Sequence, residues 1–417
     1  MSAQTGSVRW ASTPPQSGRP APARSRPRPR PAALILAVVM LVACTVVIRA
    51  SVLGDELPAH GALTLCVFCV AVWLWIFSPL EDTYVALGAA LILVSTGVVG
   101  DEDLFSSLGE ETVWLLLTAF VIAAGVTASG LATRVAAFVV TGASGLRPLF
   151  HLTTAVLVVT AFAIPSTSGR AALALPVFAA MAAVLAPHRR VVLALSLLFP
   201  SVILLSAVAS YLGAGAHLIT AQILDAAGHR SFGVATWLIL GLPLAVVSSH
   251  VCTELILRLF TRREDRREPV SISLKDMQAH SASPISGPLT TAQTRSAMLV
   301  AVVVVLWCSE PLHGLHPAIV GLLGALLAAS PRWGSVDLGK ALKSVPWSLL
   351  VFMAATLTLG TGLVDSGAAD WLAAGALGPV QRIGPGAPIA FVVLVVVLST
   401  AAHLVIQSRS ARSAVLI

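Results

Sequence analysis

The sequence predicts an all-α polytopic membrane protein made of two inverted halves. Hydrophobic residues make up 57% of the 417 positions and charged residues only 11%, whereas charged residues make up about a quarter of an ordinary soluble domain. Apolar runs of about 20 residues, the length of a membrane-spanning helix, recur along the chain. Two polar stretches inside apolar sequence also resemble one another, which indicates an internal repeat. Together these observations exclude a soluble domain.

The positive charge of the chain lies mainly outside the apolar runs. The formal net charge is +7, and six arginines lie within residues 1–30. Basic residues beside membrane spans set topology at an anionic surface, so we expect the lipid bilayer as their partner and no nucleic acid. All five cysteines lie in apolar segments. The Cys66-x-x-Cys69 spacing is therefore interpreted as two small hydrophobic residues on a helix instead of a metal or redox pair.

Residues 1–30 are predicted to form a disordered basic head on the cytoplasmic side, because they are rich in Pro, Arg and Ser and nearly devoid of apolar residues. The next segment, 31–53, is apolar and is predicted to be the first membrane helix. Its sequence Leu41-Val-Ala-Cys44 resembles a lipoprotein cleavage site, so a cleaved signal is the alternative. The apolar run continues past Cys44 and more spans follow, which favours a retained helix.

Further helices are predicted wherever an apolar run is long enough to cross a bilayer. Such runs lie near residues 60–78, 83–100, 112–130, 191–224, 232–260, 296–310, 316–330 and 346–365. Residues 261–295 begin with a run of charged residues and continue with Ser and Pro, and they are predicted to be a cytoplasmic linker. The linker divides the membrane part into a first half at 31–260 and a second half at 296–417.

Two stretches, 148–186 and 387–417, do not fit the pattern of a single span. Each contains an apolar arm, a polar tip and at least the start of a second arm. The tips, Ser166-Thr-Ser-Gly-Arg-Ala-Ala-Leu-Ala-Leu175 and Ser408-Arg-Ser-Ala-Arg-Ser-Ala-Val-Leu-Ile417, are imperfect copies. An arginine at bilayer depth costs roughly 2.5–3.5 kcal/mol, so a repeated one indicates a site. Because each arm is short for a crossing, we predict two re-entrant helical hairpins.

The positive-inside rule orients the two halves. With the basic head inside, the basic segments between the spans fall on the cytoplasmic side, and Asp101–Asp103 and Glu110-Glu111 fall outside. This parity requires that the hairpin at 148–186 opens to the cytoplasm, and the hairpin at 387–417 then opens to the outside. A weaker repeat at an offset of 237 positions, which pairs Gly130 with Gly367, also supports two inverted halves.

At the tips the sequence resembles the divalent anion:sodium symporter family, a branch of the ion transporter superfamily. The stretch Ser166–Pro176 is similar to the family's hairpin-tip motif, usually Ser-Asn-Thr-Ala-Thr before an apolar helix with Pro, and Ser408–Ile417 is similar to its second copy. Residues Ser210–Ile219 resemble the break in the family's fifth span, usually Thr-Pro-Ile-Gly-Thr-Pro-Pro-Asn. The resemblance covers about residues 60–417 in layout and implies an inverted-repeat transporter with two re-entrant hairpins.

The chain departs from the family where the motifs have asparagine. Thr167 and Arg409 occupy those positions in the tips, and His217 occupies the one after the break. The family uses these asparagines and the nearby backbone to hold sodium, so the coupling ion is open between sodium, at the hairpin tip and the 210–217 break, and a proton. The chain also ends five residues after Arg412, and the family layout would place further spans beyond that point.

The tips also show how an anion could be bound. A helix that begins at a tip presents free N–H groups and the positive end of its dipole to an anion, and hydroxyls and arginines add hydrogen bonds. The predicted substrate-binding residues are Ser166, Thr167, Ser168, Gly169, Arg170, Ser408, Ser410 and Arg412. The residues predicted to handle the coupling cation or proton are Ser210, Gly213, Ala214, His217 and Arg409. His403 and Gln407 precede the second tip and are expected near it.

Some of these residues also have a simpler interpretation. Arg170 or Arg412 could pair with a buried acid such as Asp365 or Glu254, or could hold a hairpin together by donating to carbonyl groups. His217 could be a packed residue at a helix end, with no part in proton or cation handling.

We therefore expect a multi-pass plasma-membrane protein with a cytoplasmic N-terminus that transports a small anion by alternating access. The expected substrate is a dicarboxylate, a tricarboxylate or a sulfate-like species. The alternatives are an arsenite efflux or cation/proton antiport protein of the same superfamily, and a truncated inactive fragment. An enzyme is not expected, because hydrolase motifs such as Gly-x-Ser-x-Gly are absent. No cofactor is expected beyond the coupling sodium or proton, and a homodimer is a possible assembly.

Overall fold

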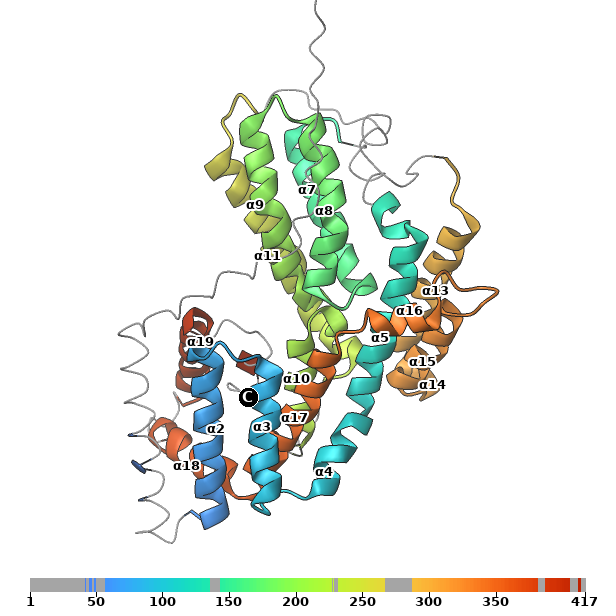
Figure 1. The fold of residues 1–417 in the computed structure, drawn as a ribbon. Helices are drawn as coiled ribbons and strands as arrows, with labels where there is room; N and C mark the ends of the chain where they lie inside the picture. Colours follow the sequence, from blue (N-terminus) through green and yellow to red (C-terminus); the bar gives the residue numbers. More distant parts are fainter. Residues whose placement is uncertain are drawn as a thin grey trace, which may run out of the picture.

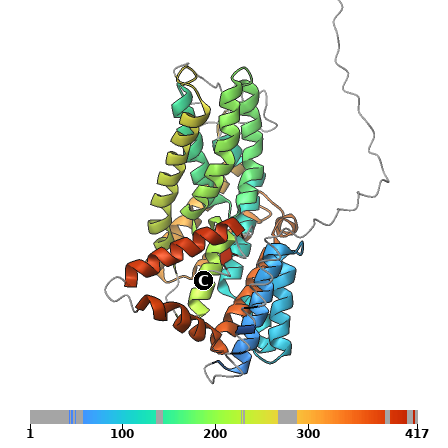
Figure 2. The ribbon, with the colours of Figure 1, turned by 90° about the vertical axis from the view of Figure 1, so that its left-hand side faces the viewer.

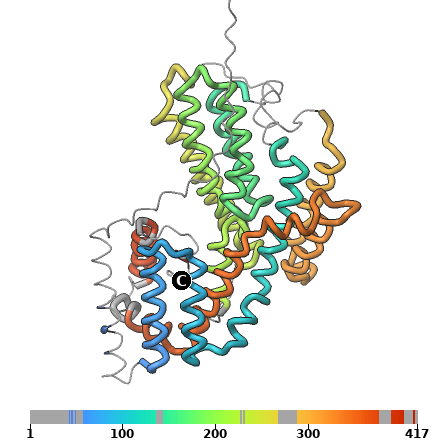
Figure 3. Tube along the Cα trace, in the orientation of Figure 1, coloured from blue at the N-terminus to red at the C-terminus, as the bar shows by residue number. Residues whose placement is uncertain are grey.

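The computed structural model describes residues 57–135, 143–226, 232–266, 287–381, 387–405 and 412–413, together with the isolated positions 42, 45, 46, 49 and 228. Within these residues every element is a helix and no strand occurs (Figure 1). Eight of the described helices are long and apolar enough to cross a membrane, which confirms the predicted all-α polytopic membrane fold. Figure 3 traces the described residues in colour. The predicted head, most of the predicted first helix and most of the linker lie outside them.

One bundle combines helices from both halves of the chain. Its members are α2 (Ala59–Phe77), α3 (Asp82–Ser95), α4 (Asp101–Ser106), η1 (Ser107–Gly109), α5 (Glu111–Ser129), α13 (Thr291–Cys308), α14 (Glu310–His313), α15 (Pro317–Ala328), α16 (Leu338–Lys343) and α17 (Trp347–Asp365). A continuous hydrophobic core joins its longer helices. Ala86, Ala90 and Leu93 form the buried face of α3, which packs against α17. Small residues at such a face let two helices approach closely in a membrane.

A second bundle consists of helices from the first half alone. Its members are α7 (Leu146–Ala163), α8 (Thr167–Val184), α9 (Arg189–Leu205) and α11 (Val234–Phe260), which lie side by side in Figures 1 and 2. Phe150, Met181 and Leu198 are fully buried in a hydrophobic core that is separate from that of the first bundle. The outer face of α11 is apolar as well, with Ile239 and Val247 exposed, as expected for a helix that faces lipid.

The predicted span 191–224 is broken and does not form one helix. After α9 the chain makes two short 3₁₀ turns, η2 (Ser206–Ala209) and η3 (Tyr211–Gly213), and then forms α10 (Gly215–Ala226). Non-helical backbone is stable at membrane depth only where protein or water surrounds it, and here Trp237 of α11 donates its Nε1–H to Val208 O at 3.0 Å. A Cβ at Gly213 would collide with the carbonyl oxygen of Ala207, so only glycine permits this turn.

The stretch 148–186 forms a helical hairpin whose arms are α7 and α8. The arms are joined at Ile164–Ser166, and Ser166 caps α8 by accepting a hydrogen bond from the Gly169 N–H at 3.2 Å. Each arm has 18 residues and could cross a membrane by its length and composition. The expectation of short arms is therefore wrong, and the re-entrant path stays a prediction. In the stretch 387–417, helix α19 (Ala387–Val405) forms the first arm, and residues 406–411 lie outside the described residues.

Two other predicted spans are shorter than expected. Helix α3 has 14 residues and α15 has 12, which correspond to about 21 and 18 Å at 1.5 Å per residue. Both lengths fall below the roughly 30 Å of the bilayer's hydrocarbon core. The α3 helix ends early because Gly97 adopts a left-handed φ of 72° after it, whereas α15 starts at Pro317, in the first turn where a proline is tolerated, and ends at Ala328.

Gly130 and Gly367, which the weaker repeat pairs at an offset of 237 positions, have the same backbone conformation. Gly130 follows α5 and Gly367 follows α17, and their φ angles are 72° and 71°. A left-handed glycine is the common way to end a helix. A second helical segment follows each glycine, residues 131–135 in the first case and α18 (Ala368–Gln381) in the second. The two positions paired by the repeat therefore share one turn.

The topology itself can be tested with two exposed positions, Ser106 at the end of α4 and Glu264 after α11. In a variant without natural cysteines, we expect Ser106→Cys to react with an impermeant maleimide added to intact cells. We expect Glu264→Cys to react only after the cells are made permeable, because the basic segment around it is predicted to lie inside. The opposite labelling pattern would exclude the predicted orientation.

Candidate functional site

A cavity of about 830 Å³ lies between the broken span of the first half and helix α19. Its walls are formed largely by aliphatic residues of 204–208 and 395–398, and its polar members are His217, Ser399, His403, Arg412 and Ser413. An apolar cavity with a few convergent polar groups is the usual form of a small-molecule site, and its volume lies within the common range of roughly 300–1,000 Å³. Figure 2 shows α19 lying across the end of the first-half helices beside this break.

His217 belongs to the first turn of α10, immediately after the break. Its Nδ1 lies 3.2 Å from the carbonyl oxygen of Ser210. A carbonyl can only accept, so Nδ1 carries the hydrogen in this contact, and Nε2 is the nitrogen that can take up or release a proton. The ring also packs against Trp237, with the ring centroids 4.7 Å apart. The histidine is thus held in one orientation while it lines the cavity.

The opposite wall carries a second histidine and an arginine. His403 Nδ1 lies 2.7 Å from the carbonyl oxygen of Ser399, which fixes the same tautomer as in His217. Arg412 and Ser413 lie half-buried beside it. The cavity therefore brings together three side chains that can carry positive charge, His217 from the first half and His403 and Arg412 from the second.

Arg170 occupies a different place, inside the first-half bundle. It is 1% exposed, and its guanidinium donates to Thr160 Oγ1 at 3.1 Å, Ile203 O at 3.1 Å, Leu157 O at 2.6 Å and Ser206 Oγ at 2.5 Å. These acceptors belong to α7, to α9 and to the first residue of the break. The geometry matches the simpler interpretation, in which the arginine holds the hairpin against its neighbours, and a direct contact with substrate stays a prediction.

The other predicted residues of the first tip do not line this cavity either. Thr167 is buried and Ser168 is exposed at the start of α8, while Ser166 and Gly169 are half-buried. Of the residues predicted for coupling, Ala214 and His217 line the cavity, and Ser210 and Gly213 form the turn behind them. Ser408, Arg409, Ser410 and Gln407 lie outside the described residues. The roles of all these residues remain predictions.

Glu254, considered above as a partner for a tip arginine, is engaged elsewhere. Its Oε1 accepts from Arg147 Nε at 2.6 Å and lies 2.8 Å from His151 Nε2. His151 in turn contacts His250 through their Nδ1 atoms at 2.7 Å. This cluster ties α7 to α11 at one end of the second bundle, far along the helix from the tip.

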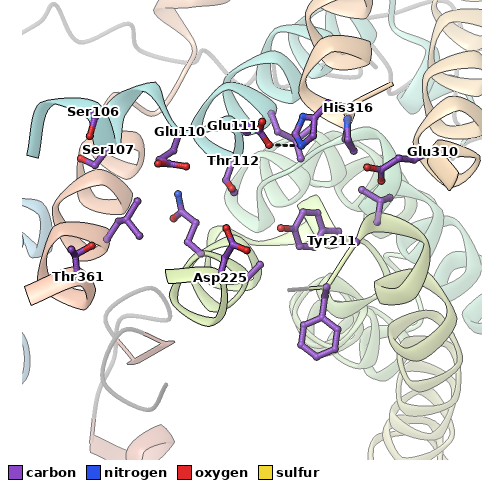
Figure 4. A pocket seen from close by; sticks show the side chains of 18 of the residues that line it. Ser106, Ser107, Glu110, Glu111, Thr112, Tyr211, Asp225, Glu310, His316 and Thr361 are labelled. Carbon is purple, nitrogen blue, oxygen red and sulfur yellow. Dashed lines mark ion pairs between the residues drawn. The ribbon is translucent and has the colours of Figure 1, made fainter. Parts of the chain in front are cut away.

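A second cavity, of about 390 Å³, collects acidic residues that are distant in sequence. Its acidic members are Asp103 and the four residues labelled in Figure 4, Glu110, Glu111, Asp225 and Glu310. His316 Nε2 forms an ion pair with Glu111 Oε2 at 2.5 Å, and Tyr211 from the break lines the same cavity. In the sequence, Glu110 and Glu111 serve only as signals of topology, and nothing there points to Asp225 or Glu310. These two residues belong to α10 and α14, and only the folding of the chain brings them to the same cavity. No cluster of metal-ligating residues occurs among the residues that the structure describes.

Comparison with known proteins extends these observations. Residues 72–411 match the model of a protein family described as "Citrate transporter". A protein of Cupriavidus necator named "Membrane protein" is 25% identical over 266 residues, which cover 62% of this chain and 50% of that protein. The "Putative malate transporter YflS" of Bacillus subtilis is 24% identical over 322 residues, which cover 73% of this chain and 64% of that protein. The matched region thus spans about half to two thirds of the length of these relatives.

Proposed function

The chain belongs to the citrate transporter family, and on this premise we propose that it is a secondary active transporter of a small dicarboxylate or tricarboxylate. The observation that carries the proposal is the cavity between the broken span and α19, where Arg412, His217 and His403 converge on an otherwise apolar wall. Substrate movement follows alternating access, as in other transporters built from inverted repeats.

The charge of the cavity suits an anion with more than one carboxylate. A guanidinium donates charge-assisted, bidentate hydrogen bonds to carboxylate, about twice as strong as neutral ones. Each histidine donates from Nε2 once it is protonated. The N-terminus of α10 adds the positive end of a helix dipole, and Ala216 in its first turn and the preceding Ala214 line the cavity. Three separated positive groups favour a dicarboxylate or tricarboxylate over a monocarboxylate.

The known proteins support a carboxylate ahead of a sulfate-like ion. The family description names citrate, and the printed name of the Bacillus subtilis relative names malate. Both molecules carry several carboxylates and a hydroxyl group. Both descriptions therefore favour a carboxylate transporter over arsenite efflux or cation/proton antiport. We also propose that the chain has the layout of the divalent anion:sodium symporter family, with re-entrant hairpins.

Arg170 has a positioning role in this scheme. Its contacts join the α8 start to the α7 end, to α9 and to Ser206 in the break. Ala207 and Val208, which follow Ser206, line the cavity. We infer that Arg170 holds the hairpin tip and the cavity wall together. The separate core of α7, α8, α9 and α11 then allows this bundle to move as one body against the other helices.

Uptake into proteoliposomes tests the proposal. We expect labelled citrate or malate to accumulate under an inward proton gradient, with each competing against the other and sulfate competing weakly. We expect a weaker response to a sodium gradient, because His217 stands where the resembled family has a sodium-binding asparagine and histidine changes its charge between about pH 5 and 8.

The matched variants are His217→Asn and His60→Asn. His217→Asn should lose the response to the proton gradient, and His60→Asn, an exposed histidine in α2, should keep it. Uptake of neither carboxylate under either gradient would overturn the substrate class. Steep sodium dependence without a response to protons would instead exclude His217 as a coupling residue.

A further inference from the structure

A groove of about 300 Å³ lies between α5, α13 and α15, away from both cavities described above. Its walls are apolar and include Val126 of α5, Leu299 and Val302 of α13 and Leu327 of α15. Val302 and Leu327 are 54% and 53% exposed. Because α13 and α15 present a row of exposed aliphatic side chains here, this side of the bundle faces lipid tails, and the groove opens to the bilayer instead of to water.

One end of the groove is polar and positively charged. The guanidinium of Arg295 lies over the ring of Trp333, 4.9 Å from its centroid, and its Nη1 donates to the carbonyl oxygen of Arg332 at 2.8 Å. The stacking and the hydrogen bond fix the plane of the guanidinium at the mouth of the groove. Ser335 lines the same end, and Arg332, which precedes Trp333 and accepts from Arg295 through its carbonyl oxygen, is exposed. A bound phosphate would find two arginines and a hydroxyl at this point.

We expect the mouth of the groove at the level of the membrane surface. Arg295 is in the first turns of α13, and Trp333 follows the end of α15, so both residues lie where these two helices leave the apolar layer. Tryptophan and arginine are the residues that mark the boundary between lipid tails and headgroups. The groove therefore has a cationic end at headgroup level and an apolar course that leads into the tail region.

We propose that this groove binds one anionic phospholipid. Its phosphate contacts Arg295 and Arg332, and part of one acyl chain lies along Val302 and Leu327. Basic pockets between membrane helices are known to recognise acidic headgroups. The apolar walls favour a lipid over free phosphate, because an acyl chain would contact them whereas phosphate would contact only the mouth of the groove. The two arginines favour an anionic headgroup over a zwitterionic one, because a zwitterionic headgroup carries a cation that already neutralises its phosphate.

Native mass spectrometry of the full chain, released from nanodiscs with equal amounts of phosphatidylglycerol and phosphatidylcholine, tests this site. We expect the parent protein to retain phosphatidylglycerol over phosphatidylcholine. Arg295→Gln should lower the retention of phosphatidylglycerol about fivefold, which corresponds to about 1 kcal/mol for one basic residue at the membrane surface. Arg295→Lys should keep part of the preference. Val302→Trp should lower retention of both lipids by filling the groove.

The control is Arg190→Gln, which removes an exposed arginine in the first turn of α9 and should leave retention unchanged. Circular dichroism and gel filtration establish that each variant is folded. Equal retention of the two lipids by the parent, or equal retention by the parent and Arg295→Gln, would overturn the proposal. Displacement of the bound lipid by millimolar inorganic phosphate would also overturn it, because it would show a phosphate site without a contribution from the acyl chain.

Discussion

Arg170→Gln is expected to lower the unfolding temperature of the purified protein and to abolish transport with it. The arginine is 1% exposed and donates four hydrogen bonds to α7, α9 and the break. Glutamine is too short to reach these acceptors together, so most of these hydrogen bonds are lost and a gap remains. Hydrogen bonds to a charged group contribute roughly 1.5–3 kcal/mol each, so the loss of two or more of them should cost at least about 3 kcal/mol. At about 2–4 °C per kcal/mol, the shift for a cooperative unit of about 150–250 residues, this loss corresponds to a fall of at least about 6 °C in the unfolding temperature.

Two further variants make the result specific. Ser206→Ala removes one of the four acceptors and should have a smaller effect, about 1.5–3 kcal/mol for a single hydrogen bond to a charged group. Ser168→Ala changes an exposed residue in the same helical turn and should leave the unfolding temperature unchanged. If Arg170→Gln unfolds at the parental temperature and yet loses uptake, the arginine acts on the substrate directly and the positioning role is wrong.

The sequence identifies most of the membrane helices because the bilayer imposes a strong pattern on them. Predicted spans at 60–78, 112–130 and 346–365 differ from α2, α5 and α17 by one residue or none at each end. The prediction fails where local chemistry overrides hydropathy. Hydropathy alone extends α3 to residue 100, but the left-handed turn at Gly97 ends it earlier. Such turns are set by backbone conformation, which an average over apolar residues does not measure.

The candidate site shows a different limit. The polar stretch at 166–170 coincides with the start of α8, and the resemblance of Ser210–Ile219 to the family's broken span indicates the region where the chain leaves helical structure after α9. The partners of Arg170 could not be predicted, because two of its acceptors are backbone carbonyls at Leu157 and Ile203, and every residue has a carbonyl. The position of α19 opposite the break also depends on packing between distant segments. His403 was expected near the second tip, but nothing in the sequence placed it across a cavity from His217.

The acidic cavity bears on how a carboxylate would approach. Five acidic residues surround a space beside the break, and their field repels a free di- or trianion. The cavity with Arg412 has the opposite character. The two cavities lie on different sides of the broken span, since Tyr211 lines the acidic one and Ala214 and His217 line the other. An anion that entered the cavity lined by Arg412 without passing the acidic cavity would avoid this repulsion. The charge distribution therefore favours entry from the side of α19.

Arg412→Gln is therefore expected to reduce carboxylate uptake at least about thirtyfold without a change in the unfolding temperature. Arg412 lines the cavity that carries the proposed function, and losing a charged partner of a desolvated carboxylate costs roughly 2 kcal/mol or more, which is about thirtyfold in affinity. In the parent, citrate or malate should raise the unfolding temperature, because a ligand that binds only the folded state stabilises it. Arg412→Gln should lose this increase, Arg412→Lys should keep part of it, and the surface variant Arg190→Gln should keep all of it. Normal uptake and a normal thermal response in Arg412→Gln would remove the arginine from the site and leave the carboxylate to the two histidines and the N-terminus of α10.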